Sequence, residues 1–173
     1  MTDPSSDEAL MDRVQQGSAD AYATLFARYR APLYGYLLRM TRRPEVADEV
    51  FQESFLSVHR ARTTWSSGDG TFRSWLYRIA TNAVRDGNRR SVRRPEVLGE
   101  DHEQSAWEAP SDRIALERAL ADLPENLRDA FLLGTVHGFD HNEIAAALEI
   151  TPDNARARVS RARARLRELL EET

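Results

Sequence analysis

An arginine-rich segment near the end of the chain, Thr151 to Leu170, restricts the possible folds more than any other stretch. Six arginines lie between Arg156 and Arg167 with no acidic residue among them, although the whole chain has a formal net charge of -4. At about 100° per residue, a helix over this segment gathers its apolar residues into one stripe, which must face a core. The stripe contains Ala155, Val159, Ala162, Leu166, Leu169 and Leu170. The segment therefore predicts an amphipathic helix packed on a core.

The opposite side of this predicted helix is suited to the major groove of DNA. It carries the short residues Asp153, Ala157, Ser160 and Ala164, flanked on one side by Arg156, Arg163 and Arg167 and on the other by Arg158, Arg161 and Arg165. A bare ridge can approach base edges while the flanking guanidinium groups reach the phosphates of both strands. Thr151 as N-cap and Pro152 in the first helical position predict where the helix begins. The alternative is a solvated surface helix, which the lack of acids within the run disfavours.

The charges of the chain are segregated, so the negative average conceals two basic blocks. Residues 71–94 contain seven arginines and one acid, whereas residues 96–112 contain six acids and no arginine. The run from Arg156 to Arg167 is again purely basic. Two basic blocks separated by an acidic one predict two contact surfaces for a polyanion.

Apolar residues recur at three- and four-residue steps through most of the chain, which is the period of an α-helix. The pattern predicts helices over residues 6–17, 20–41, 45–62, 72–88, 111–123, 124–137, 141–148 and 151–170. Pro32 lies inside the second of these helices, where it either bends the helix or begins a new segment. No strand pattern occurs, so the predicted fold class is all-α.

The segment 94–110 divides the predicted helices into two groups. It contains two prolines, many acids and little periodicity, which is typical of a linker, and Trp107 is its one sizeable apolar residue. The sequence therefore predicts two small helical domains, residues 1–93 and 111–173, joined by an acidic linker. In the second domain Asp140 is followed by Glu143, which predicts a capping box at the start of a helix.

A helix-turn-helix is predicted in the C-terminal domain. Only Glu149 and Ile150 separate the short helix 141–148 from Thr151 and the arginine-rich helix. Two helices joined by so tight a turn, the second one basic, are the arrangement that places a recognition helix in the major groove.

The N-terminal domain carries a second candidate for contact with nucleic acid. The loop 63–71, rich in Ser, Gly and Thr, contains Trp65, and the helix after it interleaves aromatic residues with arginines. Aromatic rings and cations beside a loop are what binding of single-stranded DNA requires. The alternative for Phe72 and Trp75 is an ordinary place in the core, and Trp65 and the arginines are kept as contact candidates.

The helix predicted over residues 45–62 has one acidic and polar face, made by Asp48, Glu49, Gln52 and Glu53. This face is either solvent surface or a docking face for a basic partner, and periodicity alone favours solvent surface.

Composition excludes several other classes of protein. The chain has no cysteine, so it has no disulfide framework and no thiol nucleophile. Neither a secretory signal nor an apolar run long enough to insert into a membrane is visible, so we expect a soluble cytoplasmic protein. Of the four histidines only His137 and His141 have helical spacing, and Gly138 interrupts the helix between them. We therefore expect no metal site, no cofactor and no catalytic residue.

Three blocks in this order resemble the extracytoplasmic-function class of bacterial RNA polymerase sigma factors, over nearly the whole chain. EVADEVFQESFLSVHRA is similar to the segment that docks on the polymerase clamp, and FRSWLYRIATNAVRDGNRR to the segment that opens the minus-10 element. LPENLRDAFLLGTVHGFDHNEIAAALEITPDNARARVSRARARLREL is similar to the domain that binds the minus-35 element. The resemblance implies core RNA polymerase and promoter DNA as partners, and an anti-sigma factor as the regulator.

The resemblance also implies roles for residues of the N-terminal domain. Polymerase docking is implied for Asp48, Gln52 and Glu53, which overrides the preference for plain surface. Contact with the melted minus-10 strand is implied for Asn82 and for the basic residues Arg78, Arg85, Arg89 and Arg90. The loop that captures a flipped base is implied for Trp65, Ser66, Ser67, Gly68 and Asp69.

In the C-terminal domain the resemblance implies base contacts at the minus-35 element for Arg156, Ala157 and Ser160, and backbone contacts for Arg158, Arg161 and Arg163. Asn154 either bonds an adenine edge or caps the helix. Glu149 departs from the family pattern, which has a small residue before the turn, and Asn154-Ala155 replaces the usual Thr-Val pair. Two rival classes remain at this stage: a dimeric regulator with a helix-turn-helix, and an enzyme.

Overall fold

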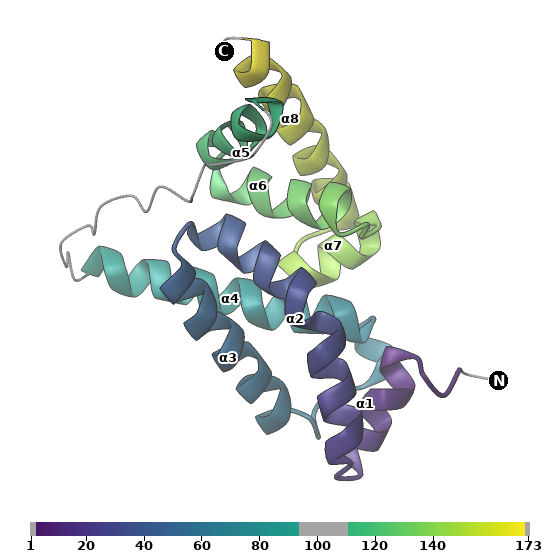
Figure 1. Cartoon of the computed structure of the whole chain (residues 1–173). Coiled ribbons are helices and arrows are strands. Elements are labelled where there is room, and N and C mark those ends of the chain that lie inside the picture. Colours follow the sequence, from purple (N-terminus) through teal and green to yellow (C-terminus); the bar gives the residue numbers. More distant parts are fainter. Residues whose placement is uncertain (1–2, 94–110, 172–173) are drawn as a thin grey trace.

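The computed structural model describes residues 3–93 and 111–171, and in this part of the chain every regular element is a helix (Figure 1). The predicted all-α fold with two helical domains is confirmed. The predictions for residues 94–110, including the acidic linker and Trp107, lie outside the described residues. The N-terminal elements are α1 (Asp7–Gln15), α2 (Ala19–Thr41), α3 (Pro44–Arg60), a 3-10 turn (Ser67–Asp69) and α4 (Phe72–Arg93). The C-terminal elements are α5 (Ser111–Asp122), α6 (Glu125–Phe131), a π-helical segment (Leu132–Val136), α7 (His141–Leu148) and α8 (Pro152–Glu171).

The N-terminal domain is built around α2, which packs against α1, α3 and α4. Ser18 caps this helix by accepting a hydrogen bond from the backbone N–H of Ala21, and α2 continues through Pro32 as one element. Its buried face meets apolar residues of all three neighbours. This core includes Met11, Leu25, Leu33, Tyr36, Leu37, Phe55, Val58, Phe72 and Leu76. The position of Pro32 on the exposed side of the helix fits the continuous course of the chain.

The C-terminal domain confirms the predicted helix-turn-helix. The Asp140 side chain accepts from the N–H of Glu143, and the Glu143 side chain accepts from the N–H of Asp140, which completes the capping box of α7. Glu149 ends α7 with φ 56°, in the left-handed region, and α8 begins three residues later. Both α7 and α6 pack on α8, so the buried stripe of α8 is covered on two sides.

Most element boundaries agree with the sequence predictions within one or two residues, and two differ by more. Helix α4 continues to Arg93, beyond the predicted end near Asn88, because Gly87 costs a helix only about 1 kcal/mol and arginines are good helix formers. The predicted helix 124–137 changes at Leu132 into a π-helical turn, in which the N–H of His137 bonds to the carbonyl of Leu132 at 3.0 Å. Such a turn inserts one extra residue and rotates the side chains that follow.

The two domains contact each other directly, with α4 lying along α7 (Figure 1). Helix α8 also packs on α7, so both basic helices of the chain contact α7. Among the described residues, no helix is both long and apolar enough to cross a membrane.

Candidate nucleic-acid interface

The exposed face of α8 carries the predicted DNA-binding side chains. Its buried stripe consists of Ala155, Val159, Ala162 and Leu166, as predicted, whereas Leu169 is only half-buried. The prediction for Leu170 is wrong, because its side chain is 40% exposed near the end of the helix. The side chains of Arg156, Ser160, Arg161 and Arg163 are exposed, while those of Ala157 and Arg158 are half-buried.

The start of α8 is held by Thr151 and not by Asn154. The Thr151 hydroxyl accepts from the N–H of Asn154 at 3.2 Å, which makes Thr151 the cap, as predicted. The Asn154 side-chain oxygen accepts from Nε of Arg158 at 3.1 Å, so the interpretation of Asn154 as a cap is wrong. This contact orients a predicted phosphate-binding arginine from the first turn of the helix.

Acidic residues near the ends of the arginine run pair with two of the arginines. Arg156 lies 3.9 Å from Asp153, and Arg165 lies 2.8 Å from Glu168. Both pairs are exposed, and exposed ion pairs contribute about 0–1 kcal/mol. A phosphate can therefore replace these carboxylates at little cost, and the charge of the face stays available to a polyanion.

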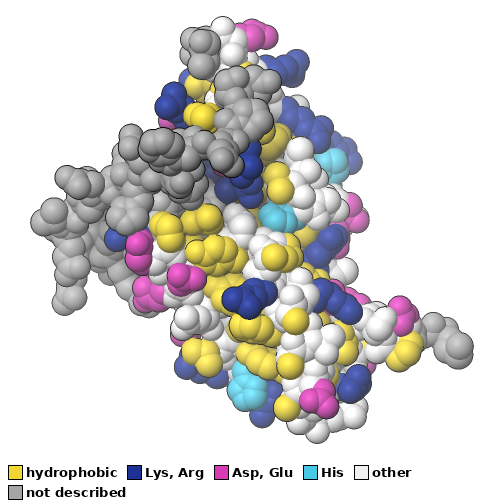
Figure 2. Space-filling model, viewed as in Figure 1, with side chains coloured by type: hydrophobic (Ala, Val, Ile, Leu, Met, Phe, Trp, Pro, Cys, Tyr) yellow, Lys and Arg dark blue, Asp and Glu magenta, His cyan; other side chains and the backbone are white. Residues whose placement is uncertain are grey.

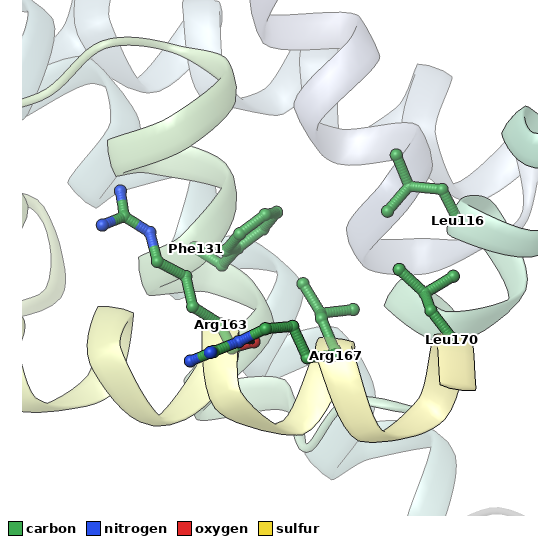
Figure 3. Close-up of a pocket in the computed structure, with 6 residues that line it drawn as sticks. Leu116, Phe131, Arg163, Arg167 and Leu170 are labelled. Atoms are coloured by element: carbon green, nitrogen blue, oxygen red, sulfur yellow. Dashed lines mark hydrogen bonds between the residues drawn. The ribbon is translucent and has the colours of Figure 1, made fainter. Parts of the chain in front are cut away.

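Leu170 lines a groove formed by residues of α5, α6 and α8. Figure 3 shows Leu116 of α5 and Leu170 of α8 facing each other, with Phe131 of α6 deeper and with Arg163 and Arg167 along α8. The sequence missed this groove because α5 covers only part of α8 at this end.

In α4, two of the predicted minus-10 residues make hydrogen bonds to the C-terminal domain. The Asn82 amide donates to Oε2 of Glu149 at 3.1 Å, and the Arg85 guanidinium donates to Oδ2 of Asp129 at 2.8 Å. Arg78 is half-buried on the same helix. The side chains of Arg89 and Arg90 lie outside those that the structure describes.

Asp129 is the one fully buried acid among the described residues of this interface, with 0% exposure. Burial raises the pKa of its carboxyl, and the charge of Arg85 and the N–H of Ala130 act in the opposite direction. A carboxylate inside a protein is tolerated when it is paired and hydrogen-bonded. Here the pairing cation comes from the other domain.

Trp65 has a different role from the predicted one. Its ring is 4% exposed and packs against Phe72 and Trp75, with ring centroids 6.4 Å away in each case. Gln15 donates to the carbonyl of Trp65 at 2.8 Å, which fixes the loop to α1. The expected stacking face of Trp65 is therefore covered in this structure, and the core reading of Phe72 and Trp75 is confirmed.

The rest of the predicted capture loop follows Trp65. Ser66 and Ser67 are exposed, whereas the side chain of Asp69 lies outside the described ones. The tryptophan thus anchors the loop, and the small polar residues after it face solvent.

On α3, the predicted polymerase-docking residues Asp48, Gln52 and Glu53 are all exposed. Glu53 also accepts from Arg60 of the same helix at 3.0 Å. Figure 2 shows hydrophobic side chains gathered over α2 and α3, with acidic side chains at one edge. The sequence reading missed Leu56, which is 49% exposed and follows Asp48 and Gln52 at four-residue steps on one side of α3. Leu56 therefore lies in line with two of the predicted docking residues.

Arg73 and His137 complete the contact between the domains. Arg73 donates to Glu143 at 2.6 Å and lies over the ring of Phe139, 4.1 Å from its centroid. The His137 ring packs against Tyr36 and Tyr77, with the Tyr77 hydroxyl 3.4 Å from Nδ1. Burial, followed by the charges of Arg39 and Arg73, lowers the pKa of His137 to about 4. The sequence reading missed this contact.

Among the described residues, no three His, Cys, Asp or Glu side chains lie close enough together to hold a metal ion. His137 packs between aromatic rings of the N-terminal domain, while His141 is exposed at the start of α7. The two histidines therefore have different surroundings.

A helix-turn-helix with an arginine-rich second helix, packed beside a second helical domain, defines a DNA-binding protein of transcription. Two family profiles match the chain: "Sigma-70 region 2" over residues 25–94 and "Sigma-70, region 4" over residues 113–166. The chain is 38% identical over 168 residues to the RNA polymerase sigma factor CarQ of Myxococcus xanthus, covering 94% of this chain and 96% of that protein. It is 31% identical over 180 residues to the ECF RNA polymerase sigma-E factor of Escherichia coli K12, covering 94% and 93%.

Solved structures agree with this result. The structure of CnrH in complex with the cytosolic domain of CnrY matches with a TM-score of 0.74 at 25% identity, covering 96% of this chain and 97% of that one. The sigma factor RpoE of Bartonella quintana, in complex with the anti-sigma factor NepR, shares the fold with a TM-score of 0.76 at 21% identity, covering 87% and 96%.

The chain belongs to the extracytoplasmic-function class of the sigma-70 family. It acts with core RNA polymerase and directs promoter-specific initiation of transcription, and it catalyses no reaction itself. The two rival classes, a dimeric regulator and an enzyme, are thereby set aside.

Proposed function

We propose that this sigma factor recognises its promoters through two separate surfaces, one in each domain. The domains are residues 1–93 and 111–173, with residues 94–110 as the linker. The observation that carries this proposal is the exposed arginine face of α8, since a helix-turn-helix presents such a face to the major groove.

The minus-35 element is bound as duplex by α8. Arg156 and the small residues Ala157 and Ser160 approach base edges, while Arg158, Arg161 and Arg163 hold the phosphates. Asn154 positions Arg158, because its side-chain oxygen accepts from that guanidinium.

The minus-10 element is bound as a melted strand by α4 and the loop before it. Asn82, Arg78, Arg85, Arg89 and Arg90 lie along the helix, and Ser66, Ser67 and Asp69 form the loop that receives a flipped base. Small polar residues suit the edge of a base-capture pocket, because they offer hydrogen bonds without filling the space. Trp65 anchors this loop, because its ring packs against Phe72 and Trp75 of α4.

Core polymerase binds the exposed side of α3. Asp48, Gln52 and Glu53 supply polar and acidic contacts, and Leu56 supplies the apolar centre that such an interface needs. The protein acts on promoter DNA of the bacterial chromosome, and its location is therefore the cytoplasm.

An anti-sigma factor holds the protein inactive. Two similar solved structures contain a bound partner: CnrH is in complex with the cytosolic domain of CnrY, and RpoE of Bartonella quintana is in complex with the anti-sigma factor NepR. The partner of this chain covers surfaces that polymerase or promoter would use.

Transcription reconstituted from purified core polymerase tests this function directly. Core plus this chain, incubated with a library of promoter fragments, is expected to select transcripts whose upstream DNA shares two spaced elements. Gel-shift assays then compare the selected fragments with and without core. Tight, dimeric binding by the chain alone, with no added effect of core, would contradict the proposal.

A further inference from the structure

We propose that α1 positions the predicted capture loop for the minus-10 base: Glu8 and Gln15 hold the two ends of the loop at a set separation, so a flipped base meets a loop that is already open. This inference rests on the proposed function, because it assumes that residues 65–69 receive that base. Helix α1 lies outside both matched family profiles, since the region 2 profile begins at residue 25.

Gln15, the last residue of α1, holds the start of the loop. Its side-chain amide donates to the carbonyl of Arg62 and to the carbonyl of Trp65, both at 2.8 Å. A glutamine amide has two N–H donors, so both are used on this one stretch of backbone. The chain turns at the same place, where the N–H of Thr64 donates to the carbonyl of Ala61 at 2.9 Å. Gln15 therefore fixes the path by which the chain enters the loop.

Glu8, in the first turn of α1, holds the end of the loop. Its Oε1 atom accepts from the backbone N–H of Phe72, the first residue of α4, at 3.2 Å. The first N–H groups of a helix have no partner within the helix, and a carboxylate there is also favoured by the helix dipole. The hydroxyl of Thr71 accepts from the N–H of Ser74 at 3.1 Å, so the two side chains satisfy different N–H groups. Glu8 therefore fixes the point at which the loop ends and α4 begins.

The separation of these two side chains makes the loop arch outward. Glu8 and Gln15 are seven residues apart, so they leave the same face of α1 about 10 Å apart along its axis. Residues 66–71, which connect the two held positions, would span about 20 Å in an extended chain. The 3-10 turn Ser67–Asp69 takes up the excess length, and the side chains of Ser66 and Ser67 are exposed. The spacing along α1 thus sets the width of the loop.

Helix α1 is a firm support for these contacts, because it is fixed to α2. The Asp7 carboxylate accepts from the guanidinium of Arg28 and from the hydroxyl of Tyr29, and Met11 is fully buried. Helix α1 packs on both α2 and α4. All of these contacts lie within the N-terminal domain, so they do not depend on where the C-terminal domain is.

The ring of Trp65 alone does not secure the loop. Its Nε1 atom is buried and has no hydrogen-bond partner among the described residues. Burying a donor without a partner is unfavourable, which offsets part of what the ring gains by packing on Phe72 and Trp75. The carbonyl of Trp65 does have a partner, Gln15. Loss of the Gln15 amide should therefore let Trp65 and the loop move together.

Trypsin tests the first part of the proposal on the free chain, because one of the held carbonyls belongs to Arg62. Cleavage after Arg62 requires this carbonyl to leave Gln15 and enter the protease. Gln15→Ala should speed that cleavage by about tenfold, the effect expected from losing two hydrogen bonds. Gln15→Glu should speed it at least as much, because a carboxylate has no N–H to donate and would face two carbonyl oxygens. Gln16→Ala, at the exposed neighbouring position, is the control, and mass spectrometry follows the fragment that ends at Arg62.

Base capture is measured on the holoenzyme, formed from core polymerase and the full chain. The probe is a promoter selected in the transcription assay, with a fluorescent adenine analogue placed in turn at each position of the minus-10 strand. Fluorescence rises when the base leaves the stack, so the parent should give a signal at the captured position.

The two held ends of the loop require opposite chemistry, which the variants separate. Gln15→Ala and Glu8→Ala should each reduce the equilibrium for base flipping, by about tenfold for the loss of two hydrogen bonds and by about threefold for the loss of one. Glu8→Gln should restore capture, because its amide oxygen still accepts from the N–H of Phe72. Gln15→Glu should not restore it. Asp12→Ala removes an exposed acid from the same helix and is the control for Glu8→Ala.

Promoter selectivity separates positioning from a loss of stability. Gln15→Ala should reduce discrimination among minus-10 variants, whereas its preference among minus-35 variants and its affinity for core should equal those of the parent. All assays are run well below the lowest melting temperature of the set. Equal losses at the minus-10 element, at the minus-35 element and in core binding would show that Gln15 only stabilises the domain, which would overturn the proposal. Cleavage after Arg62 and base flipping at the parent's levels in both Gln15 variants would overturn it too.

Failure of the proposed function would look different. If the parent holoenzyme shows no unstacked base at any minus-10 position, the assignment of the loop to base capture is wrong, whatever trypsin shows. If the parent captures a base and the Gln15 and Glu8 variants capture it equally well, that assignment stands and the positioning role of α1 is wrong.

Discussion

At the scale of single residues, α8 separates base recognition from phosphate contact. Arg156 lies beside the small residues of the ridge, so Arg156→Ala should alter the preferred minus-35 sequence and reduce discrimination by about tenfold, consistent with about 1–3 kcal/mol for a specific arginine contact. Initiation rates on a panel of minus-35 substitutions measure this effect.

Arg161→Ala is the matched comparison on the same helix. It should weaken all promoters alike and reduce the slope of log affinity against log salt by about one phosphate contact. Equal and sequence-independent losses from both variants would show that the ridge of α8 does not contact bases.

Leu56 provides a residue-scale test of polymerase docking. Its side chain is 49% exposed, so Leu56→Ala should leave the melting temperature nearly unchanged. Affinity for core polymerase should fall by about 1 kcal/mol, as expected for an apolar residue at the centre of an interface. A pull-down titration with core measures this, and unaltered affinity would place the docking surface elsewhere.

At the scale of elements, caps determine where the recognition unit begins. Asp140→Ala removes half of the capping box of α7 and should cost about 1 kcal/mol. A domain of this size should then melt about 4–8 °C lower. Thermal unfolding followed by circular dichroism measures the change, and an unchanged melting temperature would mean that the Glu143 contact with Arg73 alone holds the start of the helix.

Helix caps and apolar spacing were visible in the sequence, which is why the number and order of the long helices could be predicted. Thr151 and Asp140 cap their helices as their side-chain chemistry indicates. The π-helical turn was not predictable, because its extra residue depends on how Leu132 and Leu133 fit the core. Trp65 was misread for a related reason: polar neighbours suggested a solvent-exposed ring, whereas distant residues of α4 bury it.

At the scale of the whole molecule, the contact between domains was not predictable from spacing. Arg85 and Asp129 are 44 residues apart, and nothing local to either one signals that they meet. The candidate minus-10 residues were identified by resemblance, and the structure adds that two of them contact the other domain. Glu149 was visible as a departure from the pattern, but its partner was not.

Acidity should weaken the contact between the two domains through His137. Its ring faces Arg39 and Tyr36 of α2 and Arg73 and Tyr77 of α4, and these surroundings lower its pKa from 6.5 to about 4. When the domains are separated the ring has an ordinary pKa, so that state binds the proton first as pH falls. The contribution of His137 to the stability of the domain contact is therefore complete above about pH 6.5, declines from there to about pH 4 and falls no further below it.

The radius of gyration from X-ray scattering, measured between pH 7.5 and 4.5, checks this expectation. His137→Gln should remove the part of the expansion that begins near pH 6.5. Identical profiles for the variant and the parent would contradict a role for His137.

The exposed arginine face of α8 has a consequence for the search for promoters. This face is exposed while the two domains contact each other. Each phosphate contact that it makes releases counterions, so the free protein should bind ordinary duplex weakly and with a steep dependence on salt. Such binding would keep unassembled molecules on the chromosome, moving along it by short hops, before any polymerase joins them.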